Sequence, residues 1–159
     1  MTQRERMLAG KLYDPADGEI MREQTGCTAA MREFNTLGLG DEARMAQLMR
    51  AMFAEVGEGT YIQPPFYANW GGAHVHLGAH VYANFHLTVV DDGNVYIGAN
   101  PMIGPNVPIT TPGHHLLPSH PPPARRDNNA LLHPANTQPL AGAPNIPDAH
   151  DGAQYRLGS

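Results

Sequence analysis

The chain contains nine histidines among its 159 residues, and four of them lie close together: His74, His76, His80 and His86. Neutral imidazole is the commonest protein ligand for metal ions, and a catalytic zinc site needs three such ligands converging around an open fourth position. His74 and His76 would share one face of an extended strand, because side chains alternate along a strand. One interpretation of the cluster is therefore a zinc site built from neighbouring turns of the chain.

A second kind of chemistry is proton transfer by a histidine of the Gly113-His114-His115 segment. An imidazole with a pKa of about 6.5 can take the proton of a hydroxyl near neutral pH. Asn84 could fix that hydroxyl, since its amide both donates and accepts hydrogen bonds. Asn84 and Asp92 are also residue types that stabilise tight turns, and chemistry alone does not single out His114 from the other histidines. The chain has no glutamate after Glu58, so an aspartate, a backbone carbonyl or a partner chain would have to support His114.

The elements that must position these groups are indicated by a six-residue period between residues 75 and 110. Apolar residues recur at this spacing in two series, offset by two positions: Leu77, Ala83, Val89 and Val95, then Ile97, Ile103 and Ile109. A period of six fits neither a helix nor simple alternation along a strand. It is typical of a parallel β-helix, in which the chain turns a corner after each short strand and stacks successive coils. A loop at residues 91–94 explains the offset as one coil of about eighteen residues plus two inserted residues.

Helices are predicted before this repeat. Thr2 and Glu5 form a capping box, and the sequence Asp-Pro-Ala-Asp-Gly at residues 14–18 predicts a turn. Apolar residues at helical spacing then mark two further helices, one through Ile20, Cys27, Met31 and Phe34 and one through Met45, Leu48, Met49, Met52 and Phe53. Asp41 is expected to cap the second of these helices and Gly57 to end it. The methionine-rich stripe is interpreted as core packing.

The segment after residue 116 has a different character. Eight of the fifteen prolines lie in residues 117–159, and apolar residues there are sparse and aperiodic. Such a segment cannot bury enough apolar surface to offset its chain entropy, so we expect disorder or loosely attached coil. The predicted organisation is a helical domain at residues 1–58, a hexapeptide-repeat β-helix of about two coils at residues 59–115, and an irregular proline-rich tail at residues 116–159. The expected fold class is α+β.

Composition and charge narrow the class of protein. A formal net charge of −5 gives no basic surface for nucleic acid. Cys27 is the only cysteine, which excludes an internal disulfide and suits a reducing compartment. The N-terminus lacks the apolar core of a signal peptide, and no apolar run approaches the length of a membrane span. We therefore expect a cytoplasmic protein.

Five stretches of the chain match a known family. They are Met7-Leu8-Ala9-Gly10-Lys11-Leu12-Tyr13, Pro64-Pro65-Phe66-Tyr67, Tyr82-Ala83-Asn84-Phe85-His86-Leu87-Thr88-Val89-Val90-Asp91-Asp92, Ile103-Gly104-Pro105-Asn106-Val107 and Gly113-His114. On these motifs residues 6–114, about two thirds of the chain, resemble the bacterial maltose and galactoside O-acetyltransferases, a branch of the hexapeptide-repeat acyltransferases.

The resemblance implies a fold and an activity. The fold is a small helical N-terminal domain followed by a left-handed parallel β-helix, and the assembly is a homotrimer with active sites between subunits. The activity is transfer of an acetyl group from acetyl-CoA to a sugar hydroxyl, with no metal. The resemblance makes His114 the base and places Asn84, Tyr82 and Asp92 at the sugar acceptor. Asp17 lies near the part of the N-terminal domain that contacts the acceptor.

The resemblance stops just after His114, where the family continues with coils that wall the acetyl-CoA channel. A truncated copy or a shifted reading frame would produce this change, with a genuine tail as the less favoured explanation. Two alternatives to an active enzyme follow. One is a non-catalytic remnant, because a short stack with an unsealed end is poorly stabilised. The other is a helical module that binds a partner through its methionine-rich stripe.

Overall fold

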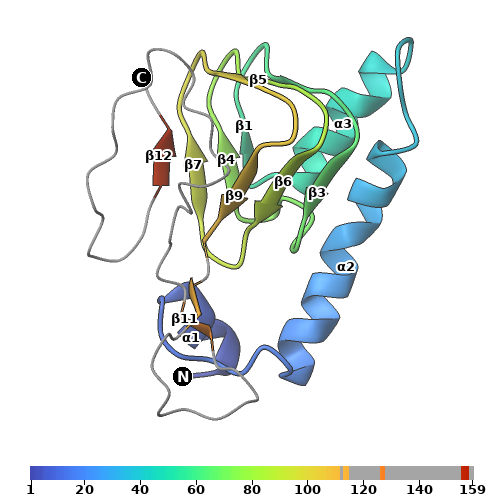
Figure 1. Ribbon diagram of the computed structural model, residues 1–159. Coiled ribbons are helices and arrows are strands. Elements are labelled where there is room, and N and C mark those ends of the chain that lie inside the picture. Colours follow the sequence, from blue (N-terminus) through green and yellow to red (C-terminus); the bar gives the residue numbers. More distant parts are fainter. Residues whose placement is uncertain (112, 115–125, 128–154, 158–159) are drawn as a thin grey trace.

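The computed structural model describes residues 1–111, 113–114, 126–127 and 155–157 (Figure 1). Its described part begins with three helices: α1 (Gln3–Leu8), α2 (Gly18–Phe34) and α3 (Glu42–Met52). The predicted capping box precedes α1: the Glu5 amide donates to Thr2 Oγ1 over 3.1 Å, and the Thr2 amide donates to Glu5 Oε2 over 2.8 Å. Among the described residues, no helix is both long and apolar enough to cross a bilayer.

Nine short strands follow, and they form three parallel sheets. In chain order they are β1 (Glu55–Val56), β2 (Tyr61–Ile62), β3 (Phe66–Ala68), β4 (Val75–Leu77), β5 (Tyr82–Ala83), β6 (Leu87–Val90), β7 (Val95–Ile97), β8 (Met102–Ile103) and β9 (Pro108–Thr110). The sheets run β1-β4-β7, β2-β5-β8 and β3-β6-β9, so each coil contributes one strand to each of three faces. This is the predicted stack of parallel coils behind an N-terminal helical segment.

The stack has three coils, whereas the sequence predicts about two. The first coil, β1 to β3, keeps the six-residue spacing at Val56, Ile62 and Ala68, but its longer connection to the next coil puts it out of phase with the later series. Ile62 pairs with Ala83 and Ala68 with Val89, 21 positions apart, whereas Ala83 pairs with Ile103 only 20 positions on. The additional residues lie between β3 and β4. Pro64-Pro65 occupies the corner between β2 and β3, outside both strands.

Between the second and third coils the predicted register is confirmed. The pairs Leu77–Ile97, Ala83–Ile103 and Val89–Ile109 are each separated by one coil plus the two residues inserted after β6. All the repeat residues are buried and point into the interior of the stack. The offset between the two apolar series is therefore a loop insertion and leaves the stacking intact.

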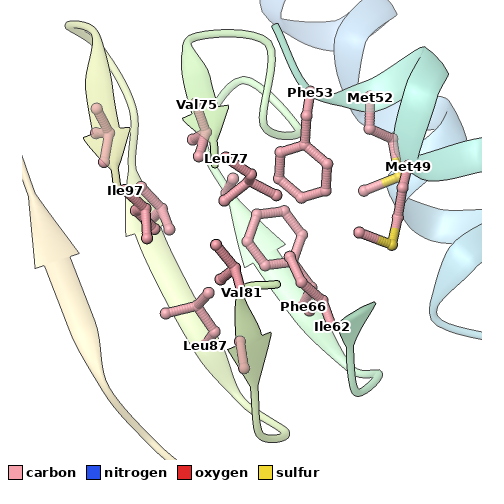
Figure 2. Close-up of a cluster of buried hydrophobic side chains, with 14 of the residues drawn as sticks. Met49, Met52, Phe53, Ile62, Phe66, Val75, Leu77, Val81, Leu87 and Ile97 are labelled. Carbon is pink, nitrogen blue, oxygen red and sulfur yellow. The ribbon is translucent and has the colours of Figure 1, made fainter. Parts of the chain in front are cut away.

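Helix α3 closes one end of the stack. Met49, Met52 and Phe53 pack with Phe66 and the apolar side chains of the first coils (Figure 2). The rings of Phe53 and Phe66 are 5.1 Å apart at their centroids. The methionine-rich stripe is thus part of the core, as predicted, which removes the alternative that it binds a separate partner.

Glycines allow close stacking at one corner. A Cβ atom on Gly57 would lie 2.3 Å from the Gly78 carbonyl carbon, and one on Gly78 would lie 2.8 Å from the Gly98 carbonyl carbon. The prediction that Gly57 ends α3 is wrong, because that helix ends at Met52 with Phe53 as its C-cap. Gly57 instead lies at the same corner as Gly78 and Gly98, so the close stacking at this corner begins in the first coil.

The described residues of the later part of the chain form further strands. β10 (Gly113–His114) pairs antiparallel with β11 (Arg126–Asp127), and β12 (Tyr155–Leu157) pairs in parallel with β7 at the edge of the first sheet (Figure 1). The rest of the predicted irregular tail lies outside the described residues.

Candidate functional site

A cavity of about 300 Å³ lies between the N-terminal helices and one edge of the stack. Its lining is Met7, Tyr13, Pro15, Ile20, Met21, Gln24, Asn69, Trp70 and Asp92. The apolar wall comes from α1, α2 and the turn between them, and most of the polar groups come from the loops after β3 and β6. Several of the polar groups converge on Asp92, an arrangement found in small-molecule sites.

Asp92 is the anionic group of this pocket and is only 3% exposed. The Tyr13 hydroxyl donates to its Oδ2 over 2.9 Å. Asn69 Nδ2 and Trp70 Nε1 donate to its Oδ1 over 3.1 and 3.3 Å. A buried carboxylate is costly unless hydrogen bonds replace its water, and these three neutral donors do so. Donors on both oxygens fix the orientation of the carboxylate in the pocket wall.

Asp91, the neighbour of Asp92, points into the protein instead of the pocket. It is fully buried, and its Oδ1 and Oδ2 accept the amide N–H groups of Trp70 (2.7 Å) and Gly72 (3.1 Å). Burial raises the pKa of Asp91, although the Trp70 amide and the nearby His74 act in the opposite direction. His74 Nδ1 lies 2.6 Å from the Asp91 carbonyl oxygen.

Of the other predicted acceptor residues, Asp17 lies closest to the pocket along the chain. It stands between the lining residues Pro15 and Ile20 and is the N-cap of α2. Its carboxylate accepts the amide N–H groups of Glu19 (3.0 Å) and Ile20 (3.4 Å). In the structure Asp17 thus caps the helix that forms one pocket wall.

Tyr82 and Asn84 lie on a different edge of the stack. Both belong to the strand and corner between the second and third faces, and the whole of β6 separates them from Asp92. Tyr82 is 37% exposed and stacks on Tyr61 with ring centroids 6.2 Å apart. Asn84 Oδ1 accepts the Phe85 amide over 2.8 Å, a local bond typical of a corner.

The backbone of His114 lies in β10, just beyond the third coil. The preceding Thr111 accepts the Gly93 amide on its Oγ1 over 2.9 Å, so the chain leaves β9 at the same edge as Asp92. Within one chain the predicted residues therefore fall on two edges: Asp92 and the start of β10 on one, Tyr82 and Asn84 on the other.

The four clustered histidines do not converge. His74 contacts Asp91 and the Trp70 ring, while His76 lies 3.5 Å from Glu55 and stacks on Tyr96. His80 and His86 occupy corners with positive φ angles of 55° and 63°. Within the part of the chain that the structure describes, no three histidine, cysteine or acidic residues are grouped to hold a metal ion. The geometry that the zinc interpretation requires is therefore not found among these four.

Sequence reasoning missed the three residues that donate to Asp92: Tyr13, Asn69 and Trp70. A signal for Tyr13 was present, since it ends the first family-like stretch, whereas its partner lies 79 positions away. Asn69 and Trp70 lie in the segment where the longer first coil interrupts the repeat. The contacts of these residues with Asp92 leave no periodic pattern in the sequence.

Comparison with known proteins identifies the family that this chain is similar to. Residues 6–57 match the family description "Maltose acetyltransferase hexapeptide capping motif". The chain is 43% identical over 108 residues to a galactoside O-acetyltransferase of Lactococcus lactis, covering 68% of this chain and 52% of that protein. It is 40% identical over 114 residues to nodulation protein L of Rhizobium meliloti, covering 71% and 61%.

Solved structures of acetyltransferases are also similar to this chain. A galactoside acetyltransferase in complex with coenzyme A superposes with a TM-score of 0.69 and 37% identity, covering 74% of this chain and 58% of that one. A maltose O-acetyltransferase from Clostridium difficile superposes with a TM-score of 0.71 and 29% identity, covering 74% and 63%.

Helices that seal a stack of parallel coils define this chain as a hexapeptide-repeat protein. Over about 70% of its length it is homologous to the galactoside and maltose O-acetyltransferases, which confirms the resemblance seen in its sequence motifs. The chain spans about half the length of the first curated relatives it matches, 52% and 56%.

Proposed function

We propose that this chain is an acetyl-CoA-dependent sugar O-acetyltransferase of the galactoside and maltose type, and that the pocket around Asp92 binds the sugar acceptor. The observation that carries the proposal is the arrangement of Asp92: a buried carboxylate, oriented by three neutral donors, at a pocket shared by the capping helices and the coils. A fixed carboxylate suits recognition of sugar hydroxyls, which donate hydrogen bonds to it. Homology to galactoside O-acetyltransferases supports the same class of acceptor.

The proposed reaction requires a base. His114 would take the proton of the sugar hydroxyl while the oxygen bonds to the acetyl carbonyl carbon. The carbon–sulfur bond of the thioester then breaks, and the proton passes to the departing thiolate. Acetyl-CoA supplies the activated acyl group, and two solved relatives are described as complexes with coenzyme A or acetyl-CoA. Asn84 and Tyr82 would hold the acceptor, with Asp17 shaping the pocket wall from the start of α2.

We further infer that the coils wind left-handed and that the active unit is a homotrimer in the cytoplasm. A trimer is supported by the separation of the proposed residues over two edges of one chain, because a neighbouring copy can bring the Tyr82–Asn84 edge to the Asp92 edge. A trimer is also supported by the exposed apolar side chains near the Tyr82–Asn84 edge: Phe85 is 44% and Met102 is 68% exposed. The free cysteine suits a reducing compartment.

The test is acetyl transfer from acetyl-CoA to a galactoside and to maltose by the purified chain, with a galactoside O-acetyltransferase that spans the full family length as the positive control. We expect turnover that falls by about tenfold or more in Asp92→Asn, since this change turns one accepting oxygen into a donor. Sedimentation equilibrium of the same sample measures the assembly.

A second candidate is a non-catalytic member of the family, because the residues that match its relatives span only about half of their length. Absence of turnover by a folded chain, beside an active control, would establish that alternative and overturn the proposal.

A further inference from the structure

Asp91 is a fully buried carboxyl that the proposed reaction does not use. It touches neither the cavity nor any surface of the stack, and burial of a carboxyl is costly unless its oxygens are bonded. Its two oxygens are occupied by the amides of Trp70 and Gly72. Asp91 therefore acts on the segment Asn69–Gly72, which we call the glycine turn.

The backbone of the glycine turn has little freedom to change conformation and form other hydrogen bonds. Gly71 and Gly72 have φ angles of 60° and 96°, in the region that favours glycine. A Cβ on Gly71 would lie 2.3 Å from the Cys27 carbonyl oxygen, and one on Gly72 would lie 2.7 Å from the Phe53 ring. The turn is thus pressed between α2 and the end of α3, and the Asp91 carboxylate supplies the acceptors for two of its amides.

The same turn carries two of the three donors described above for Asp92. The side chains of Asn69 and Trp70 both reach Asp92 Oδ1, while the Trp70 amide is held by Asp91 Oδ1. We propose that Asp91 is a positioning residue of the acceptor pocket: through the glycine turn it fixes the two side chains that orient Asp92. This inference rests on the proposed function for the ligand, but the link from Asp91 to Asp92 is a property of the fold alone.

The chain offers a specific probe of this link. Trp70 is the only tryptophan, so one indole N–H resonance in a ¹H–¹⁵N spectrum reports on its bond to Asp92. In Asp91→Asn the new NH₂ group faces one of the two backbone N–H donors, and the turn loses an acceptor. We expect the indole resonance to shift or broaden in Asp91→Asn, and to do so in Asp92→Asn as well.

A matched control is Asp41→Asn. Asp41 also accepts a backbone N–H, that of Gly38 over 3.0 Å, but it is exposed and serves a turn before α3. We expect the indole resonance to remain unchanged in this variant. The same three variants should differ in kinetics: Asp91→Asn raises KM for the sugar by about tenfold and leaves KM for acetyl-CoA unchanged, because only the acceptor pocket is disturbed.

The pH profile of acceptor binding adds a further readout. Among the described residues, the titratable groups that interact with Asp91 include His74 from the segment before β4 and Cys27 from α2. We expect Asp91→Asn to bind the acceptor more weakly than the parent chain at every pH, because the asparagine side chain does not titrate.

A folded Asp91→Asn with an unchanged indole resonance overturns the proposal, whatever the activity. If that variant does not fold, Asp91→Glu, which keeps both oxygens but displaces them by one methylene, is measured in its place, and a shifted indole resonance supports the proposal. Loss of fold in both variants also overturns it, because Asp91 would then support the whole stack. A shifted resonance in a chain without turnover supports the link and contradicts only the proposed function.

Discussion

At the level of single residues, Asp92 differs from an ordinary corner aspartate. Corner aspartates bind the backbone of their own turn, whereas Asp92 binds side chains from the segment that follows α1 and from the loop after β3. The three donors come from residues 13, 69 and 70, so the carboxylate joins the helical segment to the coils. Substitutions around it should affect acceptor binding before they affect the fold.

Tyr13→Phe tests this expectation. The change removes the hydroxyl that donates to Asp92 Oδ2 and leaves the buried ring in place. Loss of one hydrogen bond to a charged group should raise KM for the sugar about tenfold and lower the free energy of unfolding by about 1–2 kcal/mol. Steady-state kinetics and thermal denaturation measure the two effects. Tyr96→Phe, at an outward-facing ring stacked on His76, is the control and should change neither.

His114→Ala tests the proposed base. Removal of a general base should lower kcat by about 10²–10⁴-fold and leave the unfolding temperature near that of the parent chain. His86→Asn is the matched control, because His86 sits at a corner with a φ of 63° that asparagine also tolerates. Equal activity in His114→Ala and the parent chain would remove His114 from the mechanism.

Asp91 should make stability depend on pH. Its pKa in the folded chain is raised above the ordinary 3.8 by burial, so the folded state holds this proton more tightly than the unfolded state. The stability it contributes is therefore full below pH 3.8 and is lost as the pH rises through the folded pKa. The melting temperature of the parent chain minus that of Asp91→Asn should fall as the pH is raised over this window. A difference that rises with pH would mean that the folded state lowers the pKa of Asp91 instead.

At the level of elements, the stacking of the coils was easier to predict from the sequence than the side-chain contacts between the coils and the helical segment. The residues Leu77, Ala83 and Val89 predicted both the interior of the stack and, with the insertion after β6, its register. The first coil was undercounted because its longer connection to β4 hides the period. The partners of Asp92 could not be found this way, since periodicity describes neighbours one coil apart and not a tyrosine from the helical segment.

The corner at which Gly57, Gly78 and Gly98 stack gives a prediction with a matched control in the same chain. In Gly78→Ala the new Cβ would lie 2.8 Å from the backbone of the next coil, which cannot move without separating the coils. We expect a loss of about 1–3 kcal/mol in the free energy of unfolding, typical of overpacking. Gly104→Ala makes the same chemical change at a position where no atom of the described residues lies within 4 Å of the added carbon. Urea denaturation should show a smaller loss in Gly104→Ala than in Gly78→Ala.

At the level of the whole molecule, the helices and the coils act as one unit. Helix α3 packs against the interior of the stack at the first coils (Figure 1). Residues of α1 and α2 line the pocket that contains Asp92. The family motif at residues 6–57 therefore seals the stack and also forms half of the pocket. Binding of a ligand at this junction should stabilise both parts together, because it contacts both.

Helix α3 packs on the first of the described coils, whereas at the third coil the described part of the chain adds the pairing of β12 with β7. The amides of Tyr61 and Gln63 are bonded to the second coil, while those of Tyr82 and Asn84 depend on the third, the coil farthest from α3. Fraying should therefore start from the far end and travel toward the helices, as expected of stacks in which each layer is held only by its neighbours. Hydrogen–deuterium exchange should label Tyr82 and Asn84 before Tyr61 and Gln63, whereas simultaneous labelling would mean that the cylinder opens as a single block.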